Sequence, residues 1–422
     1  MIAATVLAAG GLPEGAPLPP PAEPGRLLAA GDVAMATTLL QQRIATNPRD
    51  VEAYFLLGMI AVRQRAYGTA NKYFREALAI APGQVRIRLE LARVLFLQGN
   101  YRSALRHFQL VETGHLPPAV RKNVDRFIGA IRNAKDWSYN LDIALAPDTN
   151  INNATSASEA LILGLPFTID QSARRKSGTG LALSANIEFA PRVAKHVRWR
   201  MGAFTVRRDY RRTTFDDHVY GAYTGPRTQA GAFDISILAF ASIRDYGGRV
   251  YQHSLGGRLE GAYYTSPKTV AQLTVNVEHL SFPAAPAQDG MLLTLDAGLI
   301  KAFTPVSSGS AEVAAFRQAS SSNYYSNRGG LLGFSYRREL AGGFGIELRP
   351  SISYARYDAA DPLFGRRRTD FNKEISLSAA NQKFSVWQFT PRLTYRYSQR
   401  SSSIGVYSYR QHRLEIGLAT DF

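Results

Sequence analysis

The sequence predicts an α + transmembrane β protein, with N-terminal tetratricopeptide-type helical repeats followed by a closed antiparallel outer-membrane β-barrel of about 14 strands. Three observations predict this fold. Residues 26–136 carry a 34-residue helical period, and residues 137–422 alternate between apolar and polar or small side chains with a period of two. The third observation is the last strand, residues 413–422, which alternates in the same way and ends on the aromatic Phe422.

Composition narrows the class of protein. The 422-residue chain is 45% hydrophobic, but no apolar run reaches the roughly 18 residues that a membrane-spanning helix needs. Cysteine is absent, which excludes disulfides, thiol nucleophiles and zinc–thiolate sites and fits an oxidising compartment. The formal charge of +17 admits nucleic acid, an anionic membrane surface or an acidic cargo as partner. The 21 tyrosines are typical of a membrane-interface belt.

Residues 1–25 form a segment of their own. Residues 2–9 are apolar and end in Ala8-Ala9-Gly10, which resembles the end of a signal peptide, although no basic residue precedes Arg26. A disordered tail is the alternative. Residues 11–24 are rich in proline and predict a linker.

Residues 26–136 are predicted to be a tetratricopeptide-like helical domain in the periplasm. Residues 51–84 place Tyr54, Leu57, Gly58, Ala70, Phe74, Ala77 and Pro82 at the repeat's consensus positions. Residues 85–118 place Arg88, Leu91, Ala92, Ala104, Phe108 and Val111 there, with Pro117 one place late. A small residue at the eighth position lets the two helices of a repeat approach closely. An ordinary helical bundle is the alternative interpretation.

Such repeats usually bind peptides on the concave face formed by their first helices. On this register the candidate client-binding residues are Phe55, Met59, Arg86, Arg93 and Phe96. The alternative is that these side chains pack against neighbouring helices, which applies more to the apolar ones than to the two arginines.

Residues 137–422 are predicted to form the barrel. Strand starts are expected near residues 137, 178, 195, 216, 231, 250, 268, 290, 309, 329, 344, 368, 384 and 411. A soluble sandwich rarely lines up arginine, glutamate, asparagine and threonine on so many strands, whereas a hydrated lumen requires such side chains. Tight connections alternate with longer ones. With an even strand count and the helices in the periplasm, the tight connections lie on the periplasmic side and the longer connections on the cell surface.

Several basic residues fall on the predicted inner face of the barrel. They are Arg198, Arg200, Arg349, Arg392 and Arg396. Charges in a lumen usually pair with one another, and the alternative is that these arginines guide a client. The C-terminal strand ending at Phe422 is expected to be recognised by the barrel assembly machinery, and the outer face by outer-membrane lipid.

The sequence offers little catalytic chemistry. Its histidines are scattered, and it has no Gly-x-Ser-x-Gly elbow and no phosphate-binding glycine loop. The tight cluster Asp216-Asp217-His218 is interpreted as a strand end. Asp148, Asn150, Asn152 and Glu159 have calcium-loop spacing, but Asn153 stands where glycine is needed, so an asparagine-rich loop is preferred. We expect no enzyme activity, catalytic residue, metal or cofactor.

The junction between the two regions carries a family resemblance. It reads Trp137-Ser138-Tyr139-Asn140, and then Ala146-Pro147-Asp148-Thr149-Asn150-Ile151-Asn152. Repeats followed by this junction and about fourteen strands resemble the surface lipoprotein assembly modifier (Slam) family of type XI secretion. The resemblance implies a Gram-negative outer-membrane translocator with a periplasmic repeat domain. It also implies client surface lipoproteins or secreted haem- or iron-acquisition proteins as partners, and no nucleic acid.

Two other functions remain open at this point. A polysaccharide export pore with a repeat scaffold also joins such repeats to a barrel, although a longer repeat array is usual there. A barrel lipase would need a serine–histidine pair at the lipid-facing edge, and none is evident in the sequence.

Overall fold

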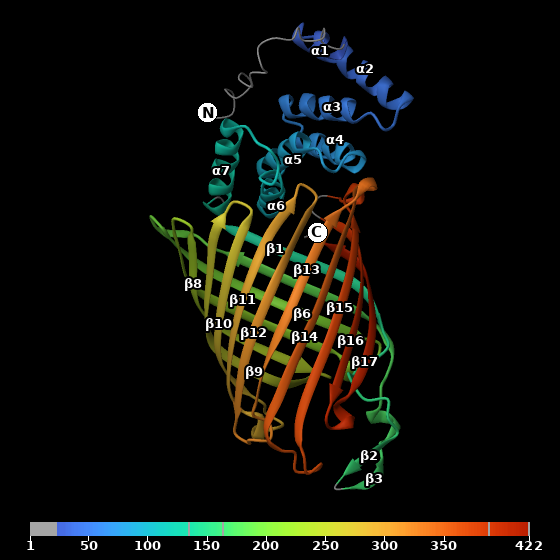
Figure 1. The fold of residues 1–422 in the computed structure, drawn as a ribbon, viewed down its shortest axis with the longest axis vertical. Helices are drawn as coiled ribbons and strands as arrows, with labels where there is room; N and C mark the ends of the chain where they lie inside the picture. Colours follow the sequence, from blue (N-terminus) through green and yellow to red (C-terminus); the bar gives the residue numbers. More distant parts are fainter. Residues whose placement is uncertain (1–22, 134–135, 163, 387–388, 421–422) are drawn as a thin grey trace.

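A computed structural model describes residues 23–133, 136–162, 164–386 and 389–420 of the chain, which form a stack of helices over one end of a large β-barrel (Figure 1). The predicted signal remnant in residues 1–22 and the C-terminal Phe422 lie outside these residues. Among the described helices, none combines the length and the apolar character needed to cross a bilayer.

The helical region consists of antiparallel pairs. Its helices are α1 Glu23–Ala29, α2 Val33–Thr46, α3 Val51–Arg63, α4 Tyr67–Ile80, α5 Val85–Leu97, α6 Tyr101–Val111 and α7 Pro118–Asn133. Asp32, Asp50 and Asn100 begin α2, α3 and α6, each accepting a hydrogen bond from a first-turn backbone N–H. A Cβ at Gly58 would lie 2.4 Å from the Phe74 ring, so only glycine lets α3 approach α4 this closely. The predicted repeat architecture is confirmed.

The barrel closes without a free edge. Its strands are β1 Trp137–Asp148, β4 Gly178–Phe189, β6 Val197–Tyr210, β7 Asp217–Ala230, β8 Phe233–Tyr246, β9 Arg249–Ser266, β10 Thr269–Ser281, β11 Gly290–Thr304, β12 Ser307–Ser320, β13 Asn327–Glu339, β14 Phe344–Ala360, β15 Arg367–Asn381, β16 Thr390–Ser402 and β17 Tyr409–Ala419. Neighbours pair antiparallel around the ring, with β1 against β17 and β4 against β6. The three-residue β5 Arg192–Ala194 only extends the β4–β6 turn. The prediction of a closed barrel of about fourteen strands is confirmed.

The two faces of the wall alternate as the period of two requires. On β8, Phe233, Ile235 and Ile237 are exposed on the outside, while Asp234 and Ser236 are buried on the inside. Most of the exposed large apolar side chains of the barrel strands lie on this outer face, which in a soluble protein would be an aggregation hazard. A lipid environment removes that hazard, because the apolar band then faces hydrocarbon.

The two ends of the barrel differ. The helices cover the end with the tight turns, where α4 contacts the turns η4 Ala341–Gly343 and η5 Gln382–Phe384 (Figure 1). We call this the helix-covered end, and the opposite end the far end. The long connection between β1 and β4 at the far end contains a small hairpin, β2 Glu159–Ile162 and β3 Leu165–Thr168, where the sequence predicted only a loop. Its strands are four residues each, too short for a periodicity to be read.

Candidate functional site

The inner wall of the barrel is polar, and its arginines pair with carboxylates on other strands. Arg200 of β6 bonds Glu188 of β4 at 2.8 Å and Glu260 of β9 at 2.6 Å. Arg392 of β16 lies 3.3 Å from Asp142 of β1 and so reaches past β17. The Arg200–Glu260 and Arg392–Asp142 pairs tie together strands that are not neighbours in the sheet, whereas Arg200–Glu188 joins the adjacent strands β4 and β6. They also fill the lumen with charges that would have to exchange partners if a polypeptide passed.

The other three predicted lumen arginines are paired as well. Arg349 bonds Glu347 at 2.8 Å, Arg396 lies 3.5 Å from Glu374, and Arg198 bonds Asp136 at 2.7 Å. The structure places all five on the inner face. Their role in guiding a client stays a prediction.

The residues predicted for the concave helical face contact their own neighbours. Phe55 and Met59 of α3 pack against the helical core, and the Arg86 guanidinium lies over the Phe55 ring at 4.9 Å. Arg93 bonds Glu90 within α5 at 2.8 Å. These contacts leave the prediction of client binding open.

Phe96 lies apart from the other four. Its ring packs edge-on against Phe127 of α7 at a centroid distance of 5.2 Å and also meets Tyr101 of α6. The helix α7, which follows the repeats, therefore covers this part of the face. Of the five candidate residues, Phe96 agrees best with the alternative that these side chains pack against neighbouring helices.

A buried arginine that the sequence analysis did not single out as functional joins the helices to the barrel. Arg88 of α5 is 0% exposed, and its Nη1 lies 2.7 Å from the carboxylate of Glu339 at the end of β13. The same side chain donates to the backbone carbonyl of Pro82 and to Nδ1 of His107 at 3.1 Å. A guanidinium only donates, so Nδ1 of His107 accepts and the ring carries its proton on Nε2. The sequence offered one signal of this role. The tetratricopeptide position that holds Tyr54 in the previous repeat holds an arginine in this one.

Burial perturbs the ionisable groups around this ion pair. Burial, reinforced by the neighbouring guanidinium groups, holds the pKa of His107 well below its ordinary value. Burial also lowers the pKa of Arg106, and it lowers that of Arg75 to about 10. His107 therefore stays neutral at physiological pH beside several cations.

Further polar contacts anchor the helices at the same end of the barrel. Arg75 of α4 donates to the backbone carbonyl of Gln382 at 2.8 Å, and Lys383 bonds Glu76 of α4 at 2.8 Å. Arg102 of α6 donates to Asn140 of β1. The helices thus hold three separate points of the barrel mouth, on β1, β13 and the turn after β15, and we call this set of contacts the junction.

The asparagine-rich stretch after β1 closes the barrel at its far end. Asp148 accepts from Arg413 and from Gln411 of β17 at 2.8 Å each. Asn150 donates to the backbone carbonyl of Arg410, and Thr149 exchanges hydrogen bonds with His412. This set of contacts, here called the seam clasp, uses Asp148 and Asn150 to join the first strand to the last. The calcium-loop reading is therefore not needed to explain these side chains.

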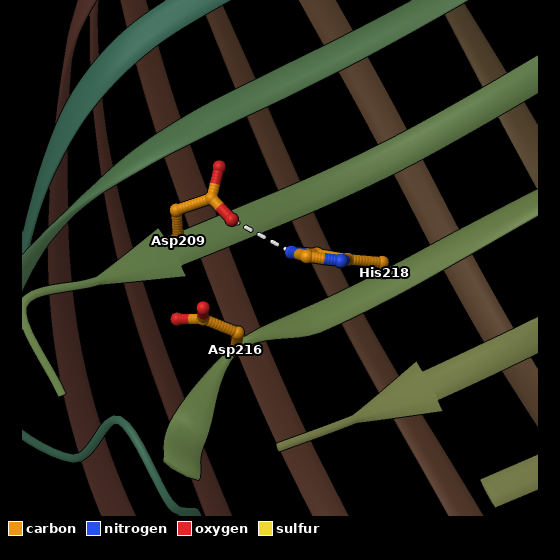
Figure 2. A group of neighbouring side chains, drawn as sticks. All are labelled: Asp209, Asp216 and His218. Carbon is orange, nitrogen blue, oxygen red and sulfur yellow. Dashed lines mark hydrogen bonds and ion pairs between the residues drawn. The ribbon is translucent and has the colours of Figure 1, made fainter. Parts of the chain in front are cut away.

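A group of three ionisable residues gathers at the far end of β6 and β7. His218 Nε2 lies 2.7 Å from Asp209, and Asp216 accepts the backbone N–H of Tyr210 at 2.7 Å (Figure 2). Arg207 also pairs with Asp209. Each carboxylate thus already has a partner within the protein, and the interpretation as a strand end is retained.

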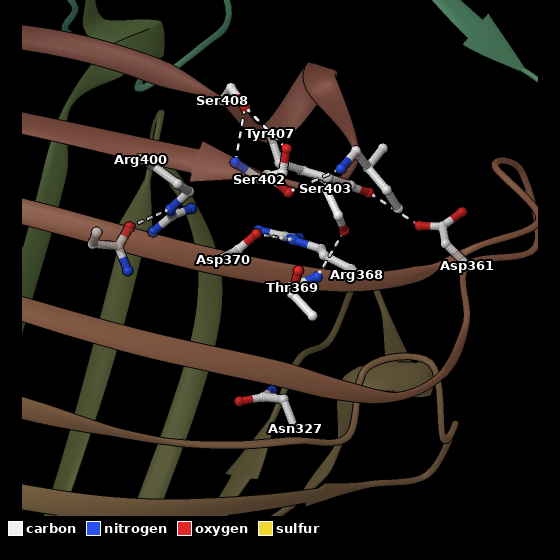
Figure 3. Close-up of polar contacts among 12 residues, drawn as sticks. Asn327, Asp361, Arg368, Thr369, Asp370, Arg400, Ser402, Ser403, Tyr407 and Ser408 are labelled. Atoms are coloured by element: carbon white, nitrogen blue, oxygen red, sulfur yellow. Dashed lines mark hydrogen bonds and ion pairs between the residues drawn. The ribbon is translucent and has the colours of Figure 1, made fainter.

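The far end also holds a layered arginine site on β15. Arg368 bonds Asp370 at 2.6 Å and lies over the rings of Tyr407 and Tyr357 at 3.6 and 4.7 Å (Figure 3). The Tyr407 hydroxyl donates to Asp361 in the next loop. Cation–π stacking and ion pairing together make these connections ordered rather than loose.

Comparison with known families decides the assignment. The family model described as "Surface lipoprotein assembly modifier" matches residues 137–422, and two tetratricopeptide models match residues 26–85 and 61–113. The chain belongs to the surface lipoprotein assembly modifier family. The match covers the whole barrel, including the stretch that forms the seam clasp.

Relatives in this family align with most of the chain. It is 23% identical over 390 residues to the hemophilin secretion modulator of Acinetobacter baumannii, covering 87% of this chain and 78% of that one. It is 25% identical over 369 residues to the surface lipoprotein assembly modifier of Moraxella catarrhalis, covering 82% and 69%. Among solved structures, the outer membrane channel DcaP of Acinetobacter baumannii superposes with a TM-score of 0.38 at 8% identity, covering 67% of this chain and 96% of that one.

Membership also settles the class of activity. As a member of this family, the protein is an outer-membrane translocator of Gram-negative bacteria and not an enzyme. Its tight turns and its helices share one end of the barrel (Figure 1), and because bacterial barrels keep their short turns in the periplasm and their longer loops outside, the far end is the extracellular one.

Proposed function

We propose that this protein moves client proteins, either surface lipoproteins or secreted haem- or iron-acquisition proteins, from the periplasm to the cell surface. The observation that carries the proposal is the junction, where a repeat module is bound over the periplasmic mouth of a polar barrel through Arg88 and Glu339. A client held by the repeats is thereby delivered to the mouth rather than released into the periplasm.

The charged lumen favours a route for polypeptide over a route for apolar molecules. Ion pairs such as Arg200–Glu188 and Arg392–Asp142 can exchange partners with a passing chain, so no bare charge is left in the wall. The periplasm supplies no nucleotide, so the drive comes from client folding outside, from differential binding or from trapping. We infer that the arginines at 198, 200, 349, 392 and 396 guide the client, and that the helical face at 55, 59, 86 and 93 receives it.

Two further partners belong to this proposal. Lipid would cover the outer band of the barrel, where Ile416 and Leu418 of the last strand are exposed. The barrel assembly machinery would recognise the C-terminal strand during insertion. We further propose residues 26–136 as the periplasmic domain and residues 137–422 as the barrel domain.

The test is surface display of a client in a strain that lacks this protein. Protease added to intact cells should digest the client in the parent strain and leave it protected in the deletion strain, with display restored by the full chain. A periplasmic marker protein controls for cell integrity. Equal digestion of the client in both strains would rule the function out.

A further inference from the structure

Three arginines stand in one cross-strand row at the periplasmic end of the barrel. Arg192 of β5 pairs in register with Arg198 of β6, and Arg198 pairs in register with Arg227 of β7. Like charges directly opposite each other on neighbouring strands destabilise a sheet. A row of three therefore needs negative charge nearby.

The protein's own carboxylates neutralise only part of this row. Arg198 bonds Asp136 at 2.7 Å, and Arg227 bonds Asp234 in a two-point contact that Gln229 shares. Over the parts of the chain that the structure describes, no ion pair involves Arg192 or the neighbouring Lys195, and both side chains are exposed. Two cations thus remain available beside the two that are already paired.

These side chains line a cavity of about 250 Å³ between α7 and the barrel mouth. Arg192, Lys195, Arg198 and Arg227 line it together with Asp234, and Gly129 of α7 closes it on the helical side. Four permanent cations face one carboxylate, which is already engaged. We call this cavity the basic pocket.

The strand alternation shows from which side the basic pocket is reached. Arg198 and Arg227 belong to the inner face, whereas Trp199, the residue after Arg198 on β6, is exposed on the outer face. Phe233 also projects outward and stacks on Tyr263 at 4.6 Å. Aromatic side chains of this kind mark the level of the lipid headgroups. The arginines therefore face the mouth that the helices cover, and not the lipid.

We propose that the basic pocket binds an acidic segment of the client polypeptide as it passes from the helices into the barrel. The proposal rests on the translocation function above. Guanidinium groups hold carboxylates through paired N–H donors, so a run of acidic side chains matches the row. The pocket adjoins α7, and Arg200 continues the line of arginines on the inner face of β6. A client released by the repeats would meet the pocket first and the paired lumen charges next.

The first test measures binding to the purified full-length protein in detergent. The probe is a fluorescent peptide of alternating glutamate and serine, with an alternating lysine and serine peptide for comparison. The variant R192E/K195E should weaken binding of the acidic peptide by about tenfold or more. The matched control is R366E/R367E, which makes the same change of charge on two exposed residues at the extracellular start of β15 and should bind as the wild type does.

The milder variant R192Q/K195Q guards against misfolding, and all variants are checked for the heat-dependent gel mobility of a folded barrel. The proposal is overturned if both pocket variants bind the acidic peptide as the wild type does, or if the wild type does not prefer it to the lysine peptide. It is also overturned if phosphatidylglycerol vesicles, but not inorganic phosphate, displace the peptide from the pocket, because the site would then be a lipid site.

A second test separates this proposal from the translocation function. In cells, the pocket variants should display less client than the loop control at equal barrel levels. If deleting the whole protein leaves display unchanged, the translocation function fails while peptide binding still decides the pocket. If the deletion abolishes display and both pocket variants display the client normally, the function stands and the pocket proposal fails.

Discussion

At the scale of single residues, one buried ion pair contributes most directly to the docking of the helices on the barrel. Glu339→Gln leaves Arg88 buried without the carboxylate that it contacts at 2.7 Å. Breaking a buried pair from one side should weaken helix docking by about 3–5 kcal/mol. Limited proteolysis of the folded protein in detergent should then release the helical region faster.

The matched control for this change is Glu90→Gln, because Glu90 pairs with Arg93 inside one helix. Its cost should stay within about 0.5 kcal/mol. Equal proteolysis of the two variants would contradict the role assigned to Glu339.

His107 gives the junction a dependence on pH. Burial holds its pKa well below the ordinary 6.5, so below pH 6.5 the unfolded state binds a proton that the folded state does not. Stability of the helical region should therefore fall as pH drops below 6.5, by up to about 1.4 kcal/mol per pH unit from this residue. The measurement is denaturant unfolding followed by helical circular dichroism between pH 7.5 and 5.5.

His107→Gln should remove that part of the slope while still offering Arg88 an acceptor oxygen. His115→Gln, at an exposed position, should keep the wild-type dependence. The explanation fails if the His107 variant shows the same loss of stability on acidification as the wild type.

Single positions also mark the limit of what the sequence could predict. The repeat pattern identified Arg88 as a consensus position, because the spacing of small and apolar residues specifies a helical hairpin locally. It could not identify Glu339 as the partner, since the two residues are 251 positions apart in the chain and meet only when the barrel has closed. The arginine row at 192, 198 and 227 was missed for the same reason, because it depends on strand register.

At the scale of elements, the seam between β1 and β17 depends on the clasp at its extracellular end. Asp148→Asn removes the charge that Arg413 and Gln411 both contact at 2.8 Å. We expect the folded barrel to lose its compact gel mobility at a clearly lower temperature. Asp142→Asn is the control, because its contact with Arg392 is longer, at 3.3 Å, and more exposed. Equal melting of both variants would show that the clasp does not stabilise the seam.

The extracellular hairpin of β2 and β3 should be dispensable for folding. Leu161, Leu165 and Phe167 are 66%, 63% and 48% exposed, so they bury little apolar surface in the barrel. Changing all three to serine should leave the melting temperature of the barrel nearly unchanged, because exposed positions usually contribute within about 0.5 kcal/mol each. A large fall in that temperature would mean that the hairpin packs on the barrel.

Elements were predicted with uneven success for a physical reason. The long strands alternate because one face meets lipid and the other water, so their predicted starts fall within two residues of the observed ones, except for β16, predicted from 384 and observed from Thr390. The extracellular turns gave no such signal. Several of them end with an aspartate or serine that accepts the last N–H of the preceding strand, as Asp216 does for Tyr210 and Ser408 does for Ser402. Such caps become recognisable only once the strand ends are known.

At the scale of the whole molecule, the arrangement of barrel, membrane and helices follows from which surfaces are apolar and which are polar. The apolar outer band requires a membrane, the closed ladder removes every edge of the main sheet, and the polar lumen faces a mouth that the helices cover. The sequence was enough to predict the fold and the family, because both depend on periodicity and on a short motif at the start of the barrel. The charge pairing inside the lumen was not, because it joins strands that are distant in sequence.

Labelling of single cysteines tests the orientation on which this account depends. The protein has no cysteine, so Arg366→Cys in an extracellular loop and Arg49→Cys between α2 and α3 each provide one reactive thiol. A membrane-impermeant maleimide added to intact cells should label residue 366 and leave residue 49 unlabelled until the outer membrane is opened. Labelling of residue 49 in intact cells, with residue 366 protected, would contradict the account.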